Sequence, residues 1–181
     1  MDNPYITPEL YGNRIILKPI TSNFCNERYL SWLNDPDVYA HLDSGGNYTM
    51  QDLHSFVNKN VKEGILFWAI VLKEENKHIG NIKIDKINKI ELEGEYGIMV
   101  GEKFFWGKGY AGEASKIVID YCFNTVGLKA IRLGVNSKNI SALNLYKKLG
   151  FDIASNESSI SINGHKDNFY RMVLLKQKLC E

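Results

Sequence analysis

Three glycines fall within six residues, at positions 107, 109 and 112 of the stretch FFWGKGYAGE. Glycine loses more backbone entropy on folding than any other residue, so such a cluster indicates a turn or a close approach that other residues cannot make. A short apolar run at 95–100 precedes the cluster, and apolar residues at helical spacing follow it at 114–122. The cluster therefore connects a predicted strand to the start of a predicted helix.

A glycine-rich connection at the start of a helix favours the binding of an anion. The first N–H groups of a helix lack intrahelical partners, and the helix dipole adds partial positive charge, so glycines there let the backbone close around a phosphate. A tight turn without a ligand explains the glycines equally well. Two known phosphate loops do not fit. The Gly-Lys-Ser/Thr ending of a P-loop is missing, and the next predicted strand, 130–136, has no acidic residue for a Rossmann fingerprint.

The remaining pattern predicts an α/β fold with a mixed sheet. Alternating or continuous apolar runs predict about seven strands, and apolar residues on one face predict about four helices. Thr49 with Asp52 resembles a capping box, and Ser141 is the expected N-cap of the last helix. We expect a single domain over residues 1–181. The predicted strands are 14–20, 65–73, 78–85, 95–100, 130–136, 151–155 and 169–176, and the predicted helices are 22–35, 49–63, 110–126 and 141–149.

Composition excludes several function classes. The chain is 44% hydrophobic and 24% charged with a net charge of +1, so we expect neither a nucleic acid nor a membrane partner. No apolar run approaches the roughly 20 residues of a membrane span, and no signal peptide is visible. Three cysteines, an odd number, suit reduced thiols in the cytoplasm, and four scattered histidines predict no metal site.

Two motifs carry a family resemblance. Residues 106–111 read WGKGYA, and residues 139–151 read NISALNLYKKLGF, with an Asn followed seven residues later by a Tyr. They resemble the two signatures of the GNAT superfamily of N-acetyltransferases, the first being Gln/Arg-x-x-Gly-x-Gly/Ala, with Trp106 in place of the usual Gln or Arg. The strands at 14–20 and 169–176 resemble those of the branch containing the ribosomal-protein alanine acetyltransferases. The similarity runs from about residue 13 to residue 176.

The resemblance implies a GNAT-type domain with a splayed sheet, and acetyl-CoA as co-substrate without a metal. Backbone N–H groups of residues 107–111 would bind the pyrophosphate, and the pantetheine would lie along residues 98–100 as an added strand. Trp106 cannot bond a phosphate as Arg does, so Lys108 or the backbone would replace that contact. Asn139 would order the cofactor or the start of the last helix. The expected cofactor-binding residues are Ile98, Met99, Val100, Trp106, Gly107, Lys108, Gly109, Tyr110, Ala111 and Asn139.

The implied chemistry is acetyl transfer to a primary amine by direct attack on the thioester. Tyr146 is the expected general acid, although by periodicity alone it belongs to an apolar stripe with Leu143 and Leu149. Glu95 is the candidate base, while Glu91 and Glu93 alternate with it and read equally as surface charges. Cys122 lies on an apolar stripe and is expected to pack.

The acceptor stays open between a protein N-terminus, a polyamine, an amino sugar and an antibiotic. Helices within 22–63 are expected to line its site, because carboxylates suit a cationic amine and aromatic rings suit a sugar or peptide. The candidates are Trp32, Asp35, Asp37, Tyr39 and Tyr48. We expect a monomer or homodimer. A non-catalytic acyl-CoA-binding regulator with the same fold is the competing interpretation.

Overall fold

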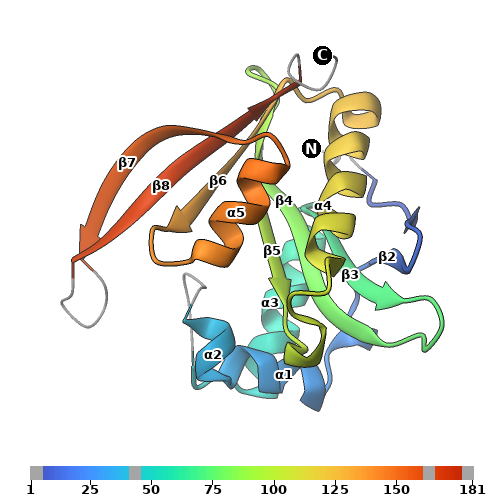
Figure 1. Cartoon of the computed structure of the whole chain (residues 1–181). Coiled ribbons are helices and arrows are strands. Elements are labelled where there is room, and N and C mark those ends of the chain that lie inside the picture. The colour runs from blue at the N-terminus through green and yellow to red at the C-terminus, as the bar shows by residue number, and fades with distance from the viewer. Residues whose placement is uncertain (1–5, 41–45, 161–165, 177–181) are drawn as a thin grey trace. The chain divides into compact units, whose positions relative to one another are not determined.

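The computed structural model describes residues 6–40, 46–160 and 166–176 (Figure 1). It divides into two compact units. The first comprises Met1–Lys86 with Gly97–Val118, and the second comprises Ile87–Tyr96 with Ile119–Glu181. Strand β5 (Glu93–Val100) and helix α4 (Tyr110–Tyr121) each contribute residues to both units.

An antiparallel meander forms the frame of the first unit. Strand β1 (Leu10–Tyr11) pairs with β2 (Ile15–Pro19), β2 with β3 (Leu66–Leu72), and β3 with β4 (His78–Asn88). All seven residues of β3 are buried, which explains its continuous apolar sequence. The strands predicted at 65–73 and 78–85 are confirmed, and they pair with each other antiparallel.

Helices α1 (Glu27–Asn34) and α3 (Met50–Lys62) pack their apolar faces into one core cluster with β3. Leu53 and Val57 of α3 are fully buried there beside Phe67 and Val71 of β3. The Thr49–Asp52 capping box starts α3 as predicted, since both reciprocal hydrogen bonds are present. Between the two helices, Pro36 opens the short helix α2 (Pro36–Tyr39), with Asp35 as its N-cap.

The second unit is built on β6 (Ala130–Asn136). The Glu93–Glu95 part of β5 runs parallel to β6, and β8 (Lys166–Leu175) pairs antiparallel with β6 along the whole length of β6. Strand β7 (Asp152–Ile160) pairs with β8. Figure 1 shows β7 and β8 as a long pair of strands, with helix α5 (Ile140–Lys148) joining β6 to β7. One face of these strands is apolar and buried; it includes Tyr96, Ile131, Leu133, Met172 and Leu174.

The α/β prediction is confirmed, with more elements than expected. The described residues contain eight strands and five α-helices, against about seven and four predicted. The additional strand, β1, has only two residues and carries no periodic signal. The additional helix, α2, is a single turn that begins directly after the predicted helix 22–35. That residues 1–181 form a single domain stays a prediction.

Two local predictions were wrong. Helix α5 begins at Ile140 and not after Ser141, because the Asn139 side chain accepts a hydrogen bond from the Ala142 N–H at 3.1 Å. Asparagine is as good an N-cap as serine, and here Asn139 has the non-helical backbone angles of a cap, whereas Ser141 lies within the helix. Strand β7 continues beyond residue 155 and β8 begins before residue 169, since polar residues such as Asn156 and Asn168 continue the ladder.

Some predictions fall outside the described residues. The glycines and polar residues of DSGGNY (43–48) predict a loop, and so do the polar residues between the last two strands; the first part of the former and the centre of the latter are not described. The same holds for His41, His165 and Cys180. Within the described part of the chain, no helix is both long and apolar enough to cross a bilayer. The same residues gather no group of three or more metal-ligating side chains.

Candidate active site

The glycine loop lies in the first unit, between a short 3-10 turn (Lys103–Phe105) and helix α4. Gly107 and Gly109 adopt φ angles of 69° and 82°, a region that side chains with a Cβ rarely occupy. A Cβ added at Gly107 would meet nothing within 4 Å. The loop therefore needs glycine there for its backbone conformation and not for lack of space.

Helix α4 opens directly behind this loop. At the start of the helix, the Glu113 N–H donates to the Gly109 carbonyl at 3.0 Å. The N–H groups of Tyr110, Ala111 and Gly112 come before that bond and have no carbonyl one turn earlier within the helix. The helix dipole places partial positive charge at the same end, so the chain offers here the geometry that binds a phosphate.

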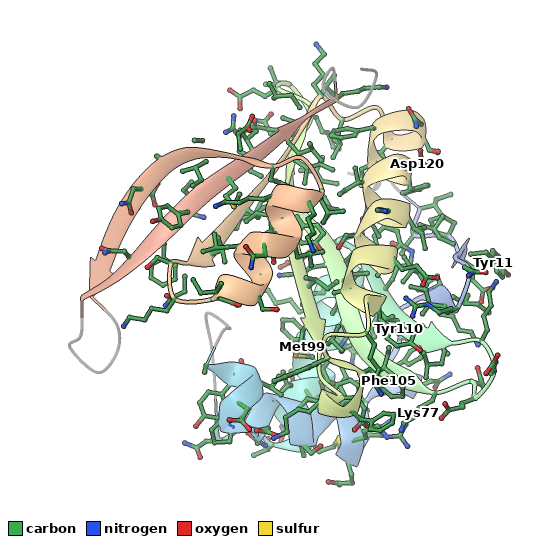
Figure 2. The ribbon with its side chains drawn as sticks, in the orientation of Figure 1. Tyr11, Lys77, Met99, Phe105, Tyr110 and Asp120 are labelled. Atoms are coloured by element: carbon green, nitrogen blue, oxygen red, sulfur yellow. The ribbon has the colours of Figure 1, made fainter. Side chains whose placement is uncertain are left out.

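Aromatic rings flank the loop. The Lys108 ammonium lies 3.4 Å from the centroid of Phe104, an exposed ring, so its charge rests on an aromatic face at the rim. The Trp106 indole N–H donates to the Val100 carbonyl at 2.6 Å and thereby ties the loop to the end of β5. Figure 2 shows Phe105 and Tyr110 beside each other at the loop, with ring centroids 5.5 Å apart.

Arg14 also reaches this loop, from the turn before β2. Its Nε donates to Glu113 at 2.8 Å, and its Nη1 donates to the Lys108 carbonyl at 3.0 Å. Burial alone would raise the pKa of Glu113, but the hydrogen bonds from the Arg14 backbone and guanidinium lower it below its ordinary value. Glu113 is therefore an anion that holds Arg14 at the loop.

The end of β5 is fixed by close backbone packing in the first unit. A Cβ added at Gly80 of β4 would come within 2.2 Å of the Met99 carbonyl oxygen, so only glycine allows this approach. The N–H groups of Gly101 and Glu102 both donate to the Ile79 carbonyl. The parallel register of β5 with β6 joins Glu93–Glu95 to Ala130–Arg132, so residues 98–100 lie beyond it.

Tyr146 lies on α5 in the second unit and is 7% exposed. Its ring packs edge-on against Tyr96, with ring centroids 5.8 Å apart, and lies tilted against Phe151, with ring centroids 5.9 Å apart. Leu143 and Leu149 are buried as well, so the apolar stripe is real. Burial raises the pKa of Tyr146 to about 12, which keeps the phenol protonated at neutral pH.

Glu95 is held in a row of charges on the second unit's sheet. Arg171 contacts Glu95 at 3.4 Å and Glu157 at 3.1 Å, and Arg132 binds Glu93 at 2.7 Å. Tyr96, the next residue of β5, packs against Tyr146 instead. Because consecutive strand residues point to opposite faces, Glu95 and Tyr146 lie on opposite faces of this sheet.

The candidate acceptor residues are mostly engaged within the first unit. Trp32 is a core residue, 4% exposed, and its ring packs against His78 at 4.9 Å. Lys103 binds both Asp35 and Asp37, at 2.7 and 2.8 Å, and hydrogen bonds to these carboxylates raise the pKa of Lys103 to about 12. The two acidic side chains therefore already share one ammonium.

Comparison with known proteins assigns the chain to a family. The model of the acetyltransferase (GNAT) domain matches residues 14–152. The chain belongs to the GNAT family. The resemblance seen in the two sequence motifs is thus confirmed at the level of the superfamily, while its branch stays a prediction.

Among similar proteins, an uncharacterized protein of Methanocaldococcus jannaschii, MJ1062, is 26% identical over 141 residues, 77% of this chain. The spermidine N(1)-acetyltransferase of Escherichia coli is 28% identical over 109 residues, 60% of this chain. These matches span only 28% and 58% of the two relatives' own lengths. A crystal structure of spermidine N-acetyltransferase from Vibrio cholerae, in complex with CoA and spermine, shares the fold with a TM-score of 0.83 and 22% identity, covering 93% of this chain and 99% of that one.

The GNAT motifs pointed to the loop and to Tyr146, but other residues at the loop escaped notice. Arg14 and Glu113 are 99 positions apart, and no local spacing links them. The Trp106–Val100 bond was missed because Trp106 was considered only as a substitute for Gln or Arg. Gly12 offered one signal: a Cβ added there would meet the Glu113 carboxylate at 2.7 Å, so a glycine before Arg14 marks a close approach.

Proposed function

We propose that this protein is an acetyl-CoA-dependent N-acetyltransferase that acts on a primary amine. The observation that carries the proposal is the glycine loop: two glycines with positive φ lead into the N-terminus of α4, in a chain that the GNAT domain model matches over residues 14–152. A phosphate-bearing co-substrate is what such a loop favours.

The residues of the loop fit this co-substrate. The N–H groups from Gly107 to Ala111 receive the pyrophosphate, and Lys108 adds positive charge at the rim. Trp106 acts through its bond to Val100, which holds the end of β5 in place. The backbone of Ile98, Met99 and Val100 pairs with the pantetheine, as an added strand satisfies peptide groups beyond a ladder. Asn139 acts by capping α5.

The chemistry is a direct transfer. The neutral amine nitrogen attacks the thioester carbonyl, the C–S bond breaks, and the amine gives up one proton. Tyr146 supplies a proton to the departing thiolate, and its buried, protonated phenol supports this role. Glu95 is the proposed base, acting through water, because its carboxylate is paired with Arg171 and lies on the sheet face opposite Tyr146.

The acceptor class is a small amine or a protein N-terminus. The name of the Escherichia coli relative supports polyamines as the first compounds to test. The carboxylates of Asp35 and Asp37 would suit such a cation, provided that it displaces the Lys103 ammonium that they share.

A panel of amines, with free CoA thiol as the readout, tests the proposal. Polyamines, amino sugars, aminoglycosides and short peptides with free N-termini are offered with acetyl-CoA. Steady thiol release that depends on one acceptor class is the expected result. Binding of acetyl-CoA without any amine-dependent release would favour the non-catalytic regulator, and absence of binding would overturn both.

A further inference from the structure

A single arginine makes three side-chain contacts around the glycine loop. The Arg14 guanidinium donates to the Glu113 carboxylate and to the Lys108 carbonyl, at 2.8 and 3.0 Å. Its Cζ lies 4.2 Å from the centre of the Tyr110 ring. Its Nη2 would be 3.5 Å from a Cβ added at Gly109. Arg14 therefore touches or borders three consecutive residues of the loop, from Lys108 to Tyr110.

The bond to the Lys108 carbonyl also fixes the direction of the next N–H group, that of Gly109. A trans peptide unit is planar, so the C=O of Lys108 and the N–H of Gly109 point in opposite directions. Because Arg14 holds that carbonyl toward itself, the Gly109 N–H must point away from the arginine. Gly109, with φ of 82°, has no Cβ that would restrict the orientation of this peptide.

We propose that Arg14 is a positioning residue that sets the direction of the Gly109 N–H for the phosphate of the co-substrate. This inference rests on the proposed function, because it assigns that N–H to the pyrophosphate. Arg14 acts through the peptide and does not contact the reacting atoms.

Glu113 holds Arg14 in this position. Its carboxylate accepts from both the backbone N–H and the Nε of Arg14, at 2.7 and 2.8 Å, and its side chain is only 16% exposed. The bond from Nε to Glu113 and the bond from Nη1 to the Lys108 carbonyl together fix the plane of the guanidinium, which a lysine ammonium does not reproduce. Glu113 also begins the hydrogen-bond ladder of α4, so these bonds join arginine, loop and helix.

The test compares two acetyl donors in Arg14→Gln, with Arg14→Lys as a milder variant. S-acetylpantetheine lacks the pyrophosphate and the nucleotide, so a misdirected Gly109 N–H affects only acetyl-CoA. We expect the KM for acetyl-CoA to rise about tenfold in Arg14→Gln and less in Arg14→Lys, with kcat within about twofold. The kcat/KM for S-acetylpantetheine should not change. Glu113→Gln should raise the same KM, and the double variant should show less than the sum.

Lys18→Gln is the matched control, since it removes one positive charge from the same region of the chain. Lys18 lies on β2 and donates to Asn76 in the turn after β3, and its loss should leave both donors unaffected. An unchanged KM for acetyl-CoA in both Arg14 variants, or an equal loss for both donors, would overturn the inference. If Arg14→Gln does not fold, Arg14→Lys decides. Failure of the wild type to bind CoA in calorimetry would instead overturn the proposed function.

Discussion

At the scale of single residues, the phenol of Tyr146 combines burial with a retained proton. Burial raises its pKa to about 12, so it stays a donor throughout the neutral range. Tyr146→Phe preserves the ring that packs against Tyr96 and Phe151 and removes only the hydroxyl. We expect kcat to fall about 100-fold or more, the usual contribution of a general acid, with CoA affinity unchanged. Steady-state kinetics with calorimetry measures both.

The raised pKa of Tyr146 also predicts, at the residue scale, how kcat depends on pH. A phenol with a raised pKa loses its proton only at high pH, so Tyr146 should not limit kcat between about pH 8 and 10. Tyr121→Phe, which removes another partly buried hydroxyl of the second unit, serves as the control. Turnover that survives in Tyr146→Phe would assign the proton to water or to another residue.

At the scale of elements, sequence periodicity predicts the helices and strands but not the contacts between segments that are distant in the sequence. The run at 65–73 became β3 and 130–136 became β6, because burial on both faces or on one face imposes a residue pattern. The glycine loop and the Thr49–Asp52 box were predictable because a positive φ and a helix N-terminus each favour particular residue types. Arg14 and Glu113 were not, since their contact depends on how distant segments pack. The paired state of Asp35 and Asp37 with Lys103 was also invisible in sequence.

The cap of α5 offers a sharp test at this scale. Asn139 and Ser141 were both plausible helix starts, and the structure gives the bond to Asn139. Asn139→Ala should lower the free energy of unfolding by about 1 kcal/mol, because the Ala142 N–H loses its acceptor. Ser141→Ala should change it by less than about 0.5 kcal/mol, as a surface substitution does. Urea unfolding measures both, and the reverse order of effects would contradict this assignment of the cap.

At the scale of the whole molecule, the two units hold different parts of the predicted machinery. Arg14, the glycine loop and the end of β5 belong to the first unit, whereas Glu95, Asn139 and Tyr146 belong to the second. A ligand that binds only the folded state shifts the unfolding equilibrium by mass action, so a co-substrate bound at the glycine loop should stabilise the protein against unfolding. Thermal unfolding therefore reports whether the co-substrate binds.

The expected stabilisation can be calculated. Acetyl-CoA at about 100 times its dissociation constant should add roughly 2.7 kcal/mol to the free energy of unfolding. For a chain of 181 residues this corresponds to a rise in Tm of roughly 5–10 °C. ATP and NAD carry phosphates and adenine but no pantetheine, so at equal concentration their shifts should be much smaller. Desulfo-CoA should retain most of the shift, because the thiol supplies chemistry and little contact area. An equal shift with ATP or NAD would make the glycine loop a general phosphate site and remove the basis for assigning pantetheine to residues 98–100.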